Sequence, residues 1–244
     1  MPFTFAHPAI VLPLAKFSRK FSLTGLIIGS LIPDFEYFLR MRIRSDYSHN
    51  LIGIFNFDLP LGLLVVFIFH YLVRDSLIHN LPLFLKSRFI NYEGYDWNSY
   101  FKNNWIIVIY SLLIGIISHI LWDNFSHNTG YFLNIFPILN EKISLFNHHI
   151  FIFKIVQHMS TMVGFIFIIL CIFRMPKHEI INLKINFDYW LIMIFIVFFV
   201  VGVRLIFGLE LYQYGHLVVN IISAILIALV LTPILINLVK YLRK

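Results

Sequence analysis

The sequence predicts an all-α membrane protein, a polytopic bundle of transmembrane helices, and three observations support this class. Hydrophobic residues make up 59% of the 244 residues, whereas charged residues make up only 13%. The mean hydropathy is +0.83, far above the value for an ordinary soluble domain. The apolar residues also extend from one end of the chain to the other, so we expect a single integral membrane domain over residues 1–244.

Six apolar runs approach the length of about 20 residues that a membrane-spanning helix needs. These runs cover residues 21–39, 51–73, 105–122, 151–173, 190–209 and 215–239. A shorter run, residues 3–15, contains Pro8 and Pro13 and is too brief to span, so we expect a short re-entrant or tilted helix there. The predicted fold is therefore six spans plus a short N-terminal helix.

The basic residues occur in short clusters between the apolar runs, although the net charge of +7 might otherwise suggest a nucleic-acid partner. With six spans, one set of alternate loops carries 13 Lys and Arg residues and the other carries 4. Since basic loops remain on the cytoplasmic side, this distribution predicts a cytoplasmic C-terminus. We therefore expect membrane lipid, and no nucleic acid, as a partner, and the sequence leaves the oligomeric state open.

Ionisable side chains inside apolar runs are costly unless they are paired or hydrated, so they are candidates for function. In the predicted topology one group of them lies on the non-cytoplasmic side: Asp34, Glu36, His49, Asp58, His119, Asp123, His127 and His158. His7 joins this group if residues 3–15 turn back at Lys16 and pack antiparallel to residues 21–39. We expect this hairpin, which would bring His7 to the level of Asp34.

The segment SHILWDNFSH, residues 118–127, places His119, Asp123 and His127 four residues apart. Residues at this spacing project from one face of a helix, provided that the helix continues to His127. Imidazole and carboxylate groups on one face suit a divalent cation, with zinc as the expected metal. Adding His7, Asp34 and His49 gives six potential ligands, enough for one metal with supporting groups or for two metals close together.

The motifs FAHPA, IPDFEYF, SDYSHNLIG, FDLPLG, IGIISHILWDNFSHNTG and KIVQHMST resemble those of a bacterial family of multi-spanning membrane proteins of unknown function. That family is similar to the predicted membrane-bound metal-dependent hydrolases, whose pattern is His, P-D-x-D-H, T-H-S and S-H-x-x-x-D. The resemblance covers about residues 1–165, which would be the metal-site part, whereas residues 166–244 would be C-terminal hydrophobic helices. It implies the bacterial cytoplasmic (inner) membrane as the location.

Position by position, the resemblance implies that the metal ligands are His7, Asp34, His49, His119 and Asp123. His127 and His158 match only the closer family. The sequence departs from the wider pattern at Glu36 and Tyr37, which replace its second Asp and its His, and this departure argues against a complete two-metal site.

The leading hypothesis is a membrane-embedded metal-dependent hydrolase that acts on a lipid or a lipid-linked ester or phosphoester. His127, His158 or Glu36 would then serve as the catalytic acid or base. One alternative is an ion- or proton-coupled transporter that uses Asp58, His158, Lys154 and Arg204. Another is a non-catalytic membrane protein with a structural metal or a polar core.

Overall fold

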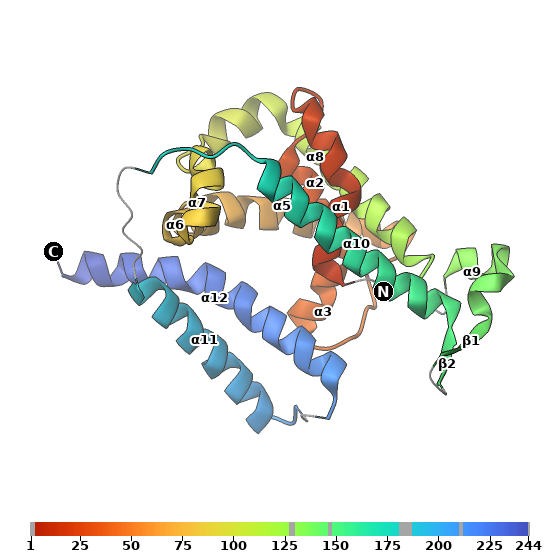
Figure 1. Ribbon diagram of the computed structural model, residues 1–244. Helices are drawn as coiled ribbons and strands as arrows, with labels where there is room; N and C mark the ends of the chain where they lie inside the picture. Colours follow the sequence, from red (N-terminus) through yellow and green to blue (C-terminus); the bar gives the residue numbers. More distant parts are fainter. Residues whose placement is uncertain (1–2, 127–129, 146–147, 181–186, 210–211, 244) are drawn as a thin grey trace. The chain divides into compact units, whose positions relative to one another are not determined.

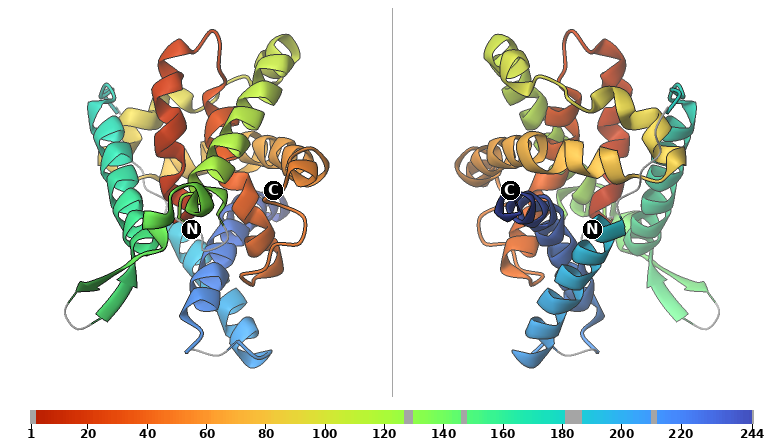
Figure 2. Two further views of the ribbon diagram at one scale, coloured as in Figure 1. Left: turned by 90° about the vertical axis from the view of Figure 1, so that its right-hand side faces the viewer. Right: turned by 90° about the vertical axis from the view of Figure 1, so that its left-hand side faces the viewer.

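The computed structural model of the protein is almost entirely helical (Figure 1, Figure 2). It describes residues 3–126, 130–145, 148–180, 187–209 and 212–243. Within these residues five helices are long and apolar enough to cross a membrane, which confirms the predicted all-α polytopic class. The five are Leu51–Asn80, Trp97–Asp123, Ile152–Arg174, Phe187–Ile206 and Tyr214–Leu242.

The predicted number of six spans is corrected by the structure, because residues 21–39 do not form one long helix. Helix α2 covers Leu23–Leu31, a 3-10 turn (η3) covers Ile32–Asp34, and helix α3 covers Phe35–Arg40. Pro33 lies in the 3-10 turn, and proline removes a backbone donor and crowds the preceding turn of a helix. None of the three pieces approaches the length of a span. Asp34 is the last residue of the 3-10 turn that separates the two helices.

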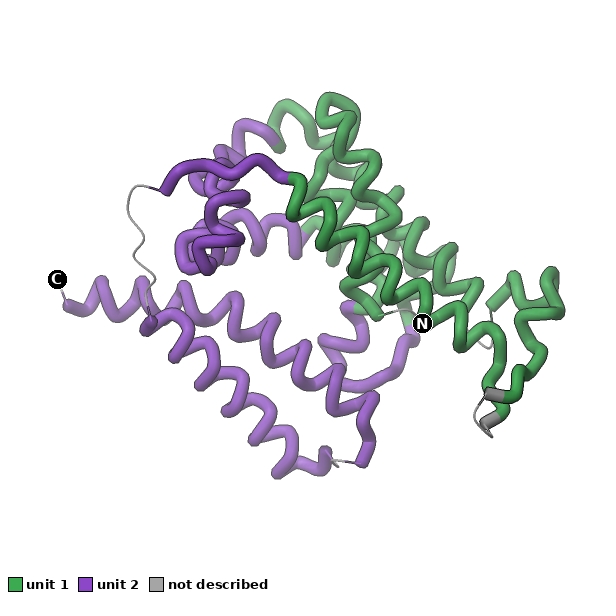
Figure 3. Tube along the Cα trace, in the orientation of Figure 1, with its two compact units in different colours: residues 1–34, 47–63, 101–174 green, residues 35–46, 64–100, 175–244 purple. Residues whose placement is uncertain are grey.

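The chain divides into two compact units (Figure 3). Unit 1 comprises residues 1–34, 47–63 and 101–174, and unit 2 comprises residues 35–46, 64–100 and 175–244. Helices α5 (Leu59–Ile68) and α8 (Trp97–Asp123) contribute to both units. The other elements of unit 1 are η1 (Thr4–Ala6), α1 (Pro8–Val11), η2 (Leu12–Phe17), α2, η3, α4 (Leu51–Gly53), η4 (Ile54–Asp58), α9 (Tyr131–Ile135), η7 (Pro137–Asn140), β1 (Lys142–Leu145), β2 (His148–Phe151) and α10 (Ile152–Arg174). The other elements of unit 2 are α3, η5 (Phe69–Val73), α6 (Arg74–Asn80), α7 (Leu83–Phe89), η6 (Ile90–Tyr92), α11 (Phe187–Ile206) and α12 (Tyr214–Leu242).

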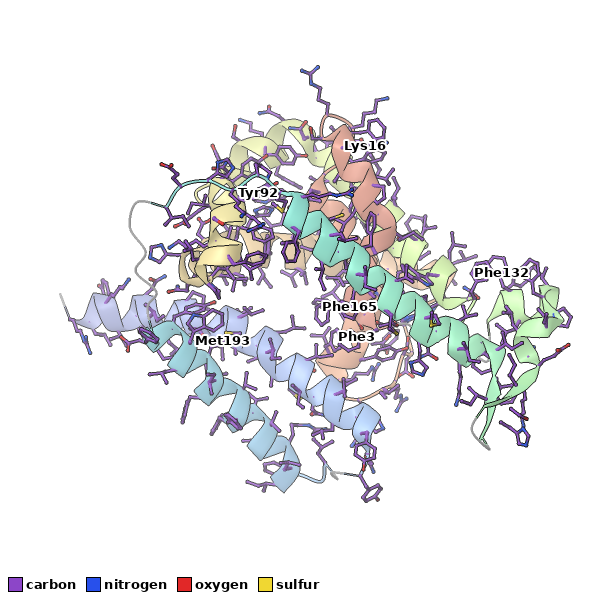
Figure 4. The ribbon with its side chains drawn as sticks, viewed as in Figure 1. Phe3, Lys16, Tyr92, Phe132, Phe165 and Met193 are labelled. Carbon is purple, nitrogen blue, oxygen red and sulfur yellow. The ribbon has the colours of Figure 1, made fainter. Side chains whose placement is uncertain are left out.

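In unit 1 the N-terminal segment turns back on itself near Lys16, as the predicted hairpin requires (Figure 4). The return brings Thr4 of η1 to Asp34 at the end of η3, and the Thr4 hydroxyl donates a hydrogen bond to Asp34 Oδ2. Helix α10 covers the N-terminal residues, and the rings of Phe3 and Phe165 lie 5.7 Å apart between centroids (Figure 4). The hairpin thereby places the start of the chain beside the break at the end of α2.

The strands β1 and β2 form a two-stranded antiparallel hairpin, the one sheet in the described part of the chain. Lys142 pairs with Phe151 in its register, and the hairpin leads directly into α10.

In unit 2 the helices α11 and α12 pack against each other, and α12 also holds the segment that follows α3. The buried Asn220 side chain donates to the Met41 carbonyl at 2.9 Å and accepts from Arg204 Nε at 2.9 Å. The Ser223 hydroxyl donates to the Phe38 carbonyl at 2.8 Å. Arg204, an ionisable residue inside a span, is therefore hydrogen-bonded to a buried amide.

Candidate metal centre

Four side chains of unit 1 converge at the ends of its helices, and we call Asp34, His49, His119 and Asp123 the metal-site cluster. Asp34 is the last residue of η3, after the break at Pro33. His49 lies in the loop before α4, whose first turn is capped by Asn50 through a 2.8 Å hydrogen bond from the Gly53 amide. The remaining two residues occupy the last turns of α8, which ends at Asp123.

One ligand atom from each residue of the cluster lies within 4.8 Å of the other three. His49 Nε2 is 3.5 Å from Asp34 Oδ1 and 3.7 Å from Asp123 Oδ2. His119 Nε2 is 3.6 Å from Asp34 Oδ1 and 3.5 Å from Asp123 Oδ2. Each imidazole nitrogen therefore faces both carboxylates, at distances longer than a hydrogen bond.

These separations fit a bound cation. With bonds of about 2.0–2.1 Å, a tetrahedral ion holds its ligand atoms about 3.4 Å apart. Asp34 Oδ1, His119 Nε2 and both oxygens of Asp123 are buried and have no hydrogen-bond partner among the described residues. Buried polar atoms normally have partners, because leaving one unpaired costs about 1–3 kcal/mol. The cluster could therefore hold a metal ion.

The remaining polar atoms of the cluster are hydrogen-bonded to groups around it. The ring N–H at His119 Nδ1 donates to the Ser30 carbonyl at 2.8 Å, which leaves Nε2 for a metal. His49 Nδ1 is hydrogen-bonded to the Ser48 hydroxyl at 2.8 Å. Asp34 Oδ2 accepts from Thr4, as described above. Hydrogen-bond partners of this kind orient the ligands in known metal sites of proteins.

The comparisons with known proteins identify one family. A model described as "Domain of unknown function (DUF4184)" matches residues 1–234. The chain belongs to this family. Comparison with curated proteins and with solved structures gives no match.

In this member of the DUF4184 family His7 lies beside the metal-site cluster but is not one of its four residues. His7 is fully buried, and its Nε2 is 3.5 Å from Asp123 Oδ1, the oxygen that does not face His49 and His119. Burial lowers the pKa of His7 to about 3, and the neighbouring His119 acts in the same direction. The ring is therefore neutral near pH 7 and faces Asp123 without adding charge.

His49 differs from the other residues of the cluster in exposure and backbone conformation. Its side chain is 20% exposed, whereas those of His119 and Asp34 are fully buried. Its φ of +63° lies in the left-handed region, which residues other than glycine seldom adopt. Burial lowers the pKa of His49, but its contacts with Asp123 and Asp34 outweigh that effect, so the net pKa is raised. His49 is therefore more accessible to solvent than the other residues of the cluster.

The other predicted site residues either are not among the four residues of the cluster or lie outside the described residues. Glu36 belongs to unit 2, where its carboxylate accepts hydrogen bonds from Arg40 Nε and from the Asp46 amide, both at 2.8 Å. His158 is exposed on α10, and Asp58 is buried in the π-helical turn η4 and is not among the four residues of the cluster. His127 lies outside the described residues.

Three groups around the cluster were not predicted from the sequence: the Thr4 hydroxyl, the Ser48 hydroxyl and the Ser30 carbonyl. Thr4 and Ser48 carry a usable signal, since each is a small polar residue within three positions of a predicted ligand. The Ser30 carbonyl carries no signal in the sequence, because every residue has a backbone carbonyl.

Proposed function

We propose that the chain is a membrane-embedded metal-dependent hydrolase whose metal is held by Asp34, His49, His119 and Asp123. The observation that supports this most strongly is the set of four distances between imidazole nitrogens and carboxylate oxygens, all of 3.5–3.7 Å. Opposite charges at a simple ion pair would approach to hydrogen-bond distance. The four candidate ligand atoms instead lie within 4.8 Å of one another, as atoms around a common cation would.

Zinc is the metal we propose for this centre. Two imidazole nitrogens and two carboxylate oxygens form a donor set that zinc accepts in tetrahedral geometry. The single cysteine of the chain, Cys171, is not part of the cluster. A cation held here would supply the Lewis acidity that hydrolysis of an ester or a phosphoester requires.

A lipid or a lipid-linked ester or phosphoester is the proposed substrate class. His49, the most exposed of the proposed ligands, lies two residues before the first residue of the candidate span Leu51–Asn80. Leu51, Ile52 and Phe55 at the start of this span are exposed apolar residues, as expected of a surface that contacts lipid. A substrate that reaches His49 from the membrane would therefore meet apolar side chains on its way.

The proton-transfer groups of the proposed reaction are histidines. His127 follows Asp123 by four residues, and His158 lies on α10 of the same unit. Imidazole exchanges protons near neutral pH, which suits the role of acid or base. We propose His127 and His158 for this role, whereas the bonds of Glu36 favour a part in holding the loop after α3.

A structural metal is a second candidate, because four protein ligands fill a tetrahedron and closed sites of this kind are usually structural. In that case the cation would stabilise the ends of α2 and α8 and no substrate would reach it. The 20% exposure of His49 favours the hydrolase.

Metal analysis of the detergent-purified protein tests the proposal. We expect about one zinc per chain in the wild type and a loss of zinc in both His119→Ala and Asp123→Ala. The exposed His79 of unit 2 offers a matched control, and His79→Ala should retain the metal. Unchanged zinc in both site variants would overturn the metal centre.

Hydrolysis separates the two candidates. The zinc-loaded protein, mixed with micellar chromogenic ester and phosphodiester probes, should release product, and the two site variants should not. A zinc-dependent rise in thermal stability with neither probe cleaved would favour the structural metal.

A further inference from the structure

Helices α2 and α8 approach each other so closely that their backbones touch. A Cβ atom added at Gly115 would lie 2.5 Å from the Ser30 amide nitrogen and 2.6 Å from the Leu26 carbonyl oxygen. A Cβ atom added at Gly29 would lie 2.3 Å from the Leu112 carbonyl oxygen. These neighbours are backbone atoms, which cannot move aside as a side chain can. Glycine at both positions is therefore required for this contact.

The close approach brings a backbone carbonyl of α2 to a ligand of the metal-site cluster. His119 follows Gly115 by one turn of α8, and its Nδ1 donates to the Ser30 carbonyl at 2.8 Å. The opposite ring nitrogen, Nε2, is buried, has no hydrogen-bond partner among the described residues and faces Asp34 and Asp123. The carbonyl thus fixes both the orientation of the ring and the nitrogen that is left for a metal.

Pro33 contributes to the same contact. In a 3-10 turn the N–H of each residue bonds to the carbonyl three residues earlier, so residue 33 would pair with Ser30. Proline has no N–H, and the turn η3 therefore offers the Ser30 carbonyl no donor at that position. The acceptor stays open for His119.

We infer, on the basis of the proposed metal function, that Gly29, Pro33 and Gly115 are positioning residues of the metal centre. They act through the Ser30 carbonyl, which holds His119 with Nε2 directed at the cation. Loss of such a supporting hydrogen bond typically lowers metal affinity about 10- to 100-fold. Residues that served packing alone would change stability and leave the affinity for metal as it is.

Isothermal titration of the detergent-purified, metal-free protein with zinc tests the two glycines. In Gly115→Ala and Gly29→Ala the added methyl group forces the helices apart, and we expect zinc affinity to fall at least tenfold. Gly62→Ala is the matched control. The nearest atom to its added Cβ would be the end of the Leu112 side chain of α8, at 3.1 Å, and not a backbone atom. This variant should bind zinc like the wild type. Wild-type affinity in both glycine variants would overturn the inference.

Pro33→Ala keeps the test decisive if the glycine variants fail to fold. Alanine supplies the missing N–H and has a higher helix propensity than proline, so thermal stability should not fall. In the 3-10 turn the new N–H lies three residues after Ser30 and competes for its carbonyl, so zinc affinity should fall. A folded Pro33→Ala protein with wild-type zinc affinity would contradict the role of the proline.

A second readout does not depend on metal. In protein labelled with ¹⁵N-histidine, the Nδ1–H proton of His119, assigned with His119→Gln, should exchange slowly with solvent in the wild type and rapidly in Gly115→Ala. If the wild type binds no zinc, the proposed function fails while this measurement still decides the positioning role. Equally slow exchange in both proteins would overturn that role.

Discussion

The imidazole rings of His7 and His119 are stacked, with 3.8 Å between their centroids and 16° between their planes. Their Nε2 atoms reach different oxygens of one carboxylate: His7 faces Asp123 Oδ1 and His119 faces Asp123 Oδ2, each at 3.5 Å. Asp123 therefore has one oxygen toward the proposed cation and the other toward a neutral imidazole. We therefore propose for His7 a supporting role that differs from that of the four proposed ligands.

Replacing His7 by phenylalanine tests this difference. His7→Phe keeps an aromatic ring against His119 but removes the nitrogen that faces Asp123. We expect zinc affinity to fall about tenfold, the range for a group that supports a ligand, and His119→Ala to abolish binding. Titration calorimetry measures both. An equally complete loss in His7→Phe would show that His7 is itself a ligand.

Metal removal should destabilise the protein. A ligand that binds only the folded state at 100 times its Kd stabilises that state by about 2.7 kcal/mol. For a chain of this length such a change corresponds to a shift in Tm of roughly 5–10 °C. We therefore expect a chelator to lower the Tm by about this amount and zinc to restore it. The Asp123→Ala protein should show no response to either addition.

Thr4→Val should weaken the site through Asp34. Valine has nearly the same shape as threonine but cannot donate to Asp34 Oδ2, and an unpaired buried acceptor costs about 1–3 kcal/mol. We expect a lower Tm and weaker zinc binding. Ser160→Ala is a suitable control. It removes a hydroxyl that, among the described residues, donates to the Gln157 carbonyl within α10. Weaker zinc binding in this control would point to a general effect of hydroxyl loss.

Zinc binding should depend on pH through His49. Contacts with Asp123 and Asp34 raise the pKa of His49 in the metal-free protein, and any proton on the ring must leave when the cation binds. Apparent affinity should therefore increase as pH rises through the raised pKa of His49, and on acidification it should fall at a higher pH than an ordinary histidine would cause. Calorimetry in buffers of different ionisation enthalpy counts the protons released. An affinity that does not change with pH across the titration range of histidine would contradict this expectation.

Glu36→Gln distinguishes a structural from a catalytic role for this residue. Its carboxylate is buried and accepts from the Arg40 side chain, the Asp46 amide and the Ser45 hydroxyl. Hydrogen bonds to a charged group contribute about 1.5–3 kcal/mol each, so the amide should lower the Tm. Zinc content and any hydrolysis by the folded protein should be unchanged. Wild-type stability with lost hydrolysis would assign Glu36 to catalysis.

The sequence was sufficient for the fold class and for part of the candidate site. Long apolar runs identify membrane helices because the lipid bilayer requires them, and the spacing of His119 and Asp123 identifies a polar helix face. Hydrophobicity overestimated the spans at residues 21–39, since the 3-10 turn at Pro33 interrupts an otherwise apolar run. The proline was a usable signal for that break.

The convergence of Asp34 and His49 on α8 could not be derived from spacing, because it depends on how the N-terminal hairpin packs. The predicted topology placed these residues on the same side of the membrane as His119 and Asp123, and the family resemblance identified them as metal ligands. The contact between Gly29 and Gly115 is equally hidden, since glycine is common in membrane helices for several reasons. Contacts through backbone atoms, such as that of the Ser30 carbonyl, depend on three-dimensional packing and leave no side-chain pattern to read.

The left-handed backbone at His49 implies a conflict between stability and function at a single residue. A non-glycine residue in this conformation costs roughly 1–3 kcal/mol, and glycine would relieve most of that cost. Selection for a more stable chain alone would thus favour glycine at position 49, whereas a metal centre needs the imidazole. A stabilised His49→Gly protein without metal would be the trade-off expected of a residue kept for its chemistry.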